Sequence, residues 1–175
     1  MLNPHLGVNP TSFFQPPLVW DIAHLPSRAT LRHVTGRNLV VPIKDKEFKE
    51  AAVYPPGMPM HLHLRHPAWS YMYAKWGPII VECRRKDNKI SVWDVLDAVH
   101  EYLQEPIGWE ELLALAPHGN DDENCRRLLD SWDQRCRTAD SLEDFERGQG
   151  IKRIDVIGDE RRWCGRYIIH YPSNF

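Results

Sequence analysis

Apolar and polar residues alternate most regularly between residues 58 and 65. Met60 and Leu62 fall on one side of an extended chain, and His61 and His63 fall on the other. A period of two is typical of a half-buried strand. A second, more uniformly apolar run over residues 79–83 follows a Gly-Pro turn, and it predicts a more deeply buried strand.

The period changes to that of helices between residues 91 and 147. Ser91 is followed three positions later by Asp94, a variant of the capping box, and Pro106 ends the helix that begins there. The apolar face of this helix consists of Val92, Val95, Leu96, Val99 and Leu103. We expect a second short helix over residues 109–116. A third, with a narrow apolar face, should lie in the acidic segment 121–147.

The two ends of the chain complete a strand–helix–strand order. Residues 39–43 predict a first strand, with Pro42 indicating an edge position. Residues 151–157 and 163–171 predict two strands of a hairpin. This order favours an α+β fold with a small mixed or antiparallel sheet, a capped helix packed on one face, and a returning C-terminal β-hairpin.

The predicted organisation is one domain with an N-terminal extension. Residues 1–38 are rich in Pro, Gly and Asn, and they predict an irregular arm that packs on the core through Leu18, Trp20 and Ile22. Residues 39–175 predict a single α+β domain that carries an acidic helical insertion at about 118–148.

Charge and cysteine content narrow the class of protein. The 175 residues include 22 Lys and Arg against 24 Asp and Glu, so the formal net charge is −2. This near-balance argues against binding to nucleic acid or to a membrane surface. The start of the chain lacks a basic segment followed by an apolar one, and the four cysteines form no C-x-x-C pair. We therefore expect a cytoplasmic protein with reduced thiols.

His61 and His63 are the main candidates for metal ligands. Two imidazoles on one face of a strand can reach a single Zn²⁺ ion, and His66, Glu82 or His170 would have to supply a third ligand. Because the sequence places only two ligands together, we expect a polar strand surface rather than a metal site, and no cofactor.

No catalytic motif is complete in this sequence. His100-Glu101 resembles the start of the zinc-protease helix motif, but Gln104 stands where the second histidine would be. No G-x-S-x-G elbow or phosphate-binding loop occurs, and neither Cys83 nor Cys164 can be paired with a histidine from sequence. The catalytic residues are therefore unknown, and whether the protein is an enzyme stays open.

A cluster of aromatic residues follows the alternating strand. Trp69, Tyr71, Tyr73 and Trp76 lie in a predicted loop that begins near His66. Aromatic side chains with a polar tip are common in interaction surfaces and pockets. The alternative is that the loop closes over the sheet and completes the core, and the usual burial of Trp and Tyr favours it.

Several segments together resemble a fungal family, domain of unknown function 6699. They are PLVWD at 17–21, WGPIIV at 76–81, ISVWDVLDAV at 90–99, QEPI with WEEL at 104–112, and RIDVIG with WCG at 153–165. The family is found widely in mushroom-forming fungi, and the resemblance covers nearly the whole chain. Most of the shared positions are apolar, cap and turn residues. The resemblance therefore implies a fold and no catalytic residue.

These observations favour a non-enzymatic binding or interaction module with its surface on strand 60–65 and loop 66–76. The alternative is a small-molecule-binding protein or enzyme of fungal metabolism, with a pocket formed by His61, His63, Glu82 and the aromatic residues. The expected partner is an unknown protein or a small molecule. The expected oligomeric state is a monomer or a homodimer.

Overall fold

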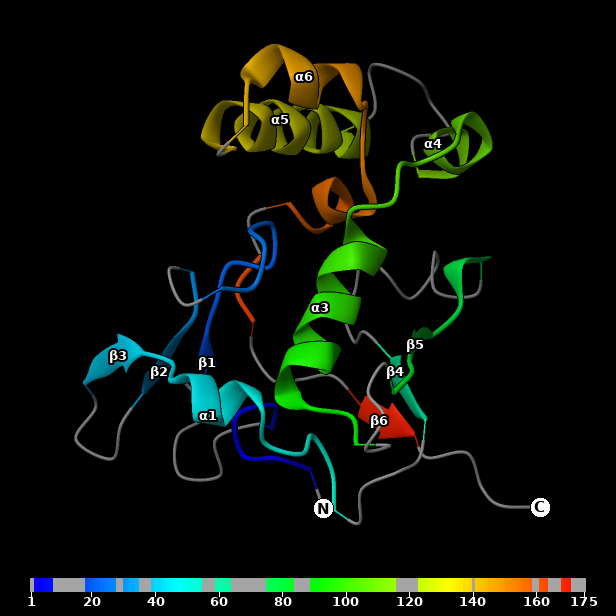
Figure 1. Ribbon diagram of the computed structural model, residues 1–175. Helices are drawn as coiled ribbons and strands as arrows, with labels where there is room; N and C mark the ends of the chain where they lie inside the picture. Colours follow the sequence, from blue (N-terminus) through cyan, green and yellow to red (C-terminus); the bar gives the residue numbers. More distant parts are fainter. Residues whose placement is uncertain are drawn as a thin grey trace. The chain divides into compact units, whose positions relative to one another are not determined.

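The computed structural model describes residues 2–7, 18–27, 30–34, 39–54, 59–63, 75–83, 89–115, 123–139, 141–158, 161–163 and 168–170. Helices and strands are both present, and the strands form two small antiparallel sheets, so the predicted α+β class is confirmed (Figure 1). Contacts along the chain divide it into two units, residues 1–100 with 162–175 and residues 101–161.

The first sheet contains three strands in the order β1–β2–β3. They span Leu18–Val19, Arg32–Val34 and Val40–Pro42. Pro42 lies in the edge strand β3, as predicted. The range expected to be an irregular arm thus contributes β1 and β2. Strands of two or three residues are too short to show an alternation of apolar and polar residues. Only their pairing with other segments identifies them.

The second sheet contains β4 (Met60–His63), β5 (Ile79–Val81) and β6 (Ile168–His170). The order of its strands is β5–β4–β6. Met60 and Leu62 are buried, whereas His61 and His63 are partly exposed, so the predicted alternation is confirmed. β6 pairs with β4, which confirms that the C-terminal segment returns to the sheet.

The predicted hairpin is wrong in its first strand. Arg153–Ile157 forms a 3-10 helix, η3, instead of a strand. The backbone N–H of Lys152 donates to the Asp155 carboxylate at 2.9 Å, which favours a turn at this point. Gly158, with φ at 64°, ends the helix in a conformation that other residues rarely adopt.

Helix α3, Val92–Leu103, begins at the capping box predicted from sequence. The Ser91 backbone N–H donates to Asp94 Oδ2 at 2.7 Å, and the Asp94 N–H donates to Ser91 Oγ at 3.3 Å. The five residues of the apolar face of α3 are all buried. The predicted cap and apolar stripe are therefore confirmed.

Two tryptophans lie at the centre of the first unit. The rings of Trp20 and Trp163 are 5.9 Å apart, and the Trp163 N–H donates to the Trp20 carbonyl oxygen at 2.8 Å. Leu18, Trp20 and Ile22 are almost completely buried, as predicted. The short helix α1 spans Asp45–Phe48, and the segment after it is joined to the loop at residues 2–7 by a hydrogen bond from the Asn3 N–H to the Ala52 carbonyl oxygen.

The second unit is helical. It contains α4, α5 and α6, which span Trp109–Leu115, Glu123–Thr138 and Glu143–Gly148, together with η3. Figure 1 shows α6 lying along α5. Cys125, Leu128 and Cys136 of α5 are buried, which confirms the predicted narrow apolar face.

Candidate functional site

The histidines of β4 lie on the exposed side of its sheet. His61 is opposite Ile80 of β5 on one side and His170 of β6 on the other. Glu82, directly after β5, is also exposed. Among the residues that the structure describes, however, His61, His63 and Glu82 do not form a group with metal-binding separations.

The predicted aromatic surface can be followed at one position. Trp76 is buried, so its ring belongs to the interior of the first unit. His66, Trp69, Tyr71 and Tyr73 lie outside the described residues. Whether this loop forms an interaction surface therefore stays a prediction.

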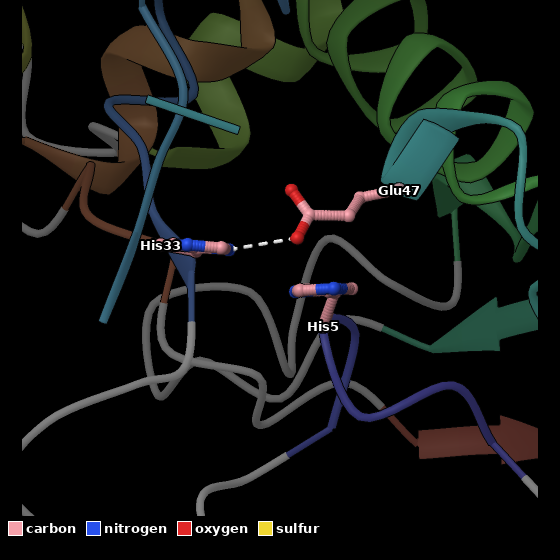
Figure 2. A group of neighbouring side chains, drawn as sticks. All are labelled: His5, His33 and Glu47. Carbon is pink, nitrogen blue, oxygen red and sulfur yellow. Dashed lines mark ion pairs between the residues drawn. The ribbon is translucent and has the colours of Figure 1, made fainter. Parts of the chain in front are cut away.

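A cluster that the sequence does not indicate brings together His5, His33 and Glu47 (Figure 2). Each residue offers one ligand atom, and all three atoms lie within 4.8 Å of one another. The imidazole rings are nearly parallel, with an interplanar angle of 8° and centroids 5.7 Å apart. His33 Nδ1 is 3.5 Å from Glu47 Oε1.

Three separate segments position this cluster. His33 is on β2, the central strand of the first sheet, where it pairs with Leu18 and Val41. Glu47 is on α1, and its Oε2 accepts the Lys44 backbone N–H at 2.6 Å. That bond fixes the carboxylate, so that Oε1 is directed towards His33, as Figure 2 shows.

The third member is held by the N-terminal loop. The His5 backbone N–H donates to Asn3 Oδ1 at 2.9 Å, and Asn3 Nδ2 donates to the Ala51 carbonyl oxygen at 3.0 Å. Burial lowers the pKa of His5 below its ordinary value, against the opposing influence of the Glu47 and Glu50 carboxylates.

A buried ionic network is the second notable group of side chains. Arg135 of α5 contacts Asp155 of η3 through two hydrogen bonds, at 2.8 and 3.0 Å, and Glu146 of α6 at 2.9 Å. Its guanidinium also donates to the Gly150 carbonyl oxygen at 2.9 Å. Lys152 Nζ donates to Glu146 at 3.2 Å and to Gln104 at 3.0 Å. Every charge in the network has an opposite partner, which is the pattern of a structural centre.

The partners of Glu146 and Arg135 shift the pKa values of both groups in the direction that favours the charged form. The Ser141 hydroxyl, followed by Lys152 and Arg135, lowers the pKa of Glu146. Hydrogen bonding and charge from Asp155 raise the pKa of Arg135 despite its burial. Both groups are thus charged over the ordinary pH range, so neither is suited to exchange protons at neutral pH.

Burial makes one of the described cysteines, Cys136, unsuited to act as a nucleophile. Cys83, Cys125 and Cys136 form no disulfide within the described part of the chain, and Cys164 lies outside it. Burial raises the pKa of Cys136 above its ordinary value. A raised pKa disfavours the thiolate that a catalytic cysteine requires.

The most exposed large apolar side chains in the described part of the second unit lie on two helices. On α6, Leu142 at the N-cap is 81% exposed and Phe145 is 62% exposed. On α4, Trp109 is 71% exposed, and Leu113 lies on the same side one turn later. Neither helix has a buried residue.

Comparison with known proteins establishes the family. Residues 18–167 match the model of the family of unknown function DUF6699. The chain therefore belongs to this family, as its motifs indicated. No match was found among the curated proteins or the solved structures. No described helix is both long and apolar enough to cross a membrane.

Proposed function

We propose that this member of the DUF6699 family is a non-enzymatic interaction module that binds a basic, amphipathic segment of a partner protein through α6. The α6 surface consists of Leu142, Glu143, Asp144 and Phe145. It differs from the surface on strand 60–65 and loop 66–76 that the sequence favoured, because the described residues of that region, 60–63 with 75 and 76, include no large exposed apolar side chain.

One observation carries this proposal: α6 is attached through Glu146 and Arg147, and it exposes its apolar side chains. Glu146 is bound by Arg135, Lys152 and Ser141, and Arg147 is bound by Asp133. An ordinary surface helix buries its apolar residues and exposes its charges. Exposed aromatic and aliphatic side chains at the centre of a surface are typical of binding hot spots.

The charge of the second unit indicates the chemistry of the partner. Residues 101–161 contain 16 acidic and 8 basic residues, a net charge of −8. Glu143 and Asp144 are exposed beside Leu142 and Phe145. A partner with leucine-like side chains flanked by Lys or Arg would complement both features, and its binding would weaken with salt.

The proposal is tested with a synthetic amphipathic peptide that carries leucines on one face and lysines on the other. We expect the full-length protein to bind it in a fluorescence-anisotropy titration, with weaker binding at high salt. The same peptide with glutamates in place of lysines should not bind. The double variant Leu142→Ser/Phe145→Ser should weaken binding at least about tenfold, as expected for hot-spot residues.

The matched control is Trp109→Ser/Leu113→Ser on α4, which removes comparable exposed apolar surface from the same unit. This variant should bind the lysine peptide like the unaltered protein. Equal binding of both peptides, or full binding by the α6 variant, would overturn the proposal.

The alternative, a small-molecule pocket around His61, His63 and Glu82, stays open. Its support is the position of His61 between Ile80 and His170 in the register of the second sheet. Fungal origin, a cytoplasmic location and a monomeric or homodimeric state also stay predictions from the sequence.

A further inference from the structure

We propose that His5, His33 and Glu47 form a binding site for one divalent transition-metal ion of the zinc class. This site is in the first unit, so it is independent of the interaction surface on α6. It also differs from the strand site of His61 and His63 that the sequence suggested.

The donor set determines the class of ion. Two imidazoles and one carboxylate are ligands typical of zinc and neighbouring transition metals, whereas Mg²⁺ and Ca²⁺ prefer oxygen ligands alone. Three protein ligands leave a fourth position of a tetrahedral ion for water or another small ligand.

The separations come close to those that a shared ion needs. Ligands about 2.0–2.1 Å from a tetrahedral ion lie about 3.3–3.4 Å from one another. His33 Nδ1 and Glu47 Oε1 are already 3.5 Å apart. The remaining ligand atom, from His5, lies within 4.8 Å of both, and rotation of its side chain would bring it into range.

A simple ion pair explains only part of the cluster. An ion pair with Glu47 needs one protonated histidine, yet two histidines face this carboxylate (Figure 2). His5 is half-buried, and its ring stacks on that of His33 at a centroid distance of 5.7 Å. The side chains of His33 and Glu47 are only 15% and 12% exposed, so water screens the cluster weakly.

The surrounding hydrogen bonds arrange the ligands before an ion binds. Glu47 uses Oε2 for the Lys44 N–H, which leaves Oε1 directed at the site. Asn3 holds the loop of His5 against Ala51. Such outer contacts orient metal ligands and raise affinity. A bound ion would also join the N-terminal loop, β2 and α1.

The experiment is isothermal titration of the chelator-treated, full-length protein with Zn²⁺. We expect one ion to bind per chain, and no comparable binding of Mg²⁺. His5→Ala, His33→Ala and Glu47→Gln should each weaken zinc binding by more than about tenfold. Glutamine at position 47 can still accept the Lys44 N–H, so Glu47→Gln preserves the cap while it removes the charged ligand.

Thermal unfolding provides a second readout. Zinc at about 100 times its dissociation constant should raise Tm by about 5–10 °C in the unaltered protein, and by much less in the three variants. The matched control is the double variant His61→Ala/His63→Ala, which removes two histidines from the other sheet and should bind zinc normally.

Three results would overturn the proposal. They are failure to bind zinc at one ion per chain, unchanged binding by Glu47→Gln and both single-histidine variants, or loss of binding in the His61/His63 control instead. The last result would place the metal on β4.

Discussion

The two units of this protein are stabilised in different ways. Among the described residues, the first unit contains 20 of the buried apolar side chains and the second contains 6. In the described part of each unit, five large apolar side chains are nevertheless exposed. In the described part of the second unit, exposed large apolar side chains are thus almost as numerous as buried apolar ones, and the apolar core of this unit is small.

Charge divides the two units in the same way. The first unit has a net charge of +6, from 14 basic and 8 acidic residues, and the second has −8. Self-repulsion among like charges destabilises a compact state. In the second unit, Arg135 and Lys152 offset this repulsion at the point where α5, α6 and η3 meet. Ionic pairing thus replaces part of an apolar core.

The largest effect should come from the tryptophan centre of the first unit. Trp20→Ala would leave a cavity beside Trp163 and end the hydrogen bond from Trp20 Nε1 to the His24 carbonyl oxygen, which is 3.0 Å long. We expect a loss of about 3–5 kcal/mol in the free energy of unfolding, measured by urea denaturation. Trp109→Ala on α4 is the control, with a change within about 0.5 kcal/mol. Similar losses in both variants would remove the contrast between core and surface.

Arg135→Met tests whether the second unit depends on its ionic network. The substitution would leave the Asp155 carboxylate, whose side chain is 0% exposed, without its guanidinium partner. We expect a loss of about 3–5 kcal/mol, because an uncompensated charge stays buried. Arg127→Ala, at a surface pair with Glu123, should cost less than about 0.5 kcal/mol. If both variants lose equally little, the network does not stabilise this unit.

Ser91→Ala tests the capping box of α3. Both partners are buried, and the Ser91 hydroxyl donates to Asp94 Oδ2 at 2.6 Å and accepts the Asp94 N–H. We expect a loss of about 0.5–2 kcal/mol in urea denaturation. Ser91→Thr should keep most of the stability, because threonine also caps helices. An equal loss in the threonine variant would indicate that packing, and not capping, matters at this position.

The smallest effect should be the pH dependence that Glu146 contributes. Its pKa is lowered in the folded protein, so the stabilisation is complete above the ordinary carboxyl pKa of 4.5 and is lost as the pH falls through the folded value. In Glu146→Gln, this part of the acid destabilisation should disappear from denaturation curves measured between pH 7 and 3. Parallel pH profiles for the two proteins would contradict this assignment.

Local periodicity explains which elements could be predicted. The alternation around β4, the Ser91 cap and the apolar face of α3 depend on residues within four positions of one another, and all three are confirmed. Residues 151–157 predict a strand, but the structure forms the 3-10 helix η3 there. There Asp155 is buried by its pairing with Arg135, 20 positions away, and a strand pattern carries no record of that partner.

The sequence by itself determined the α+β class, the capped helix, the return of the C-terminal segment to β4 and the family to which the chain belongs. Only the tertiary structure brought His5, His33 and Glu47 together, because they come from a loop, a strand and a helix with no common spacing. Only the tertiary structure, likewise, placed Glu146 of α6 inward and Leu142 and Phe145 outward. Both features depend on contacts between distant residues, which no local pattern of polarity can specify.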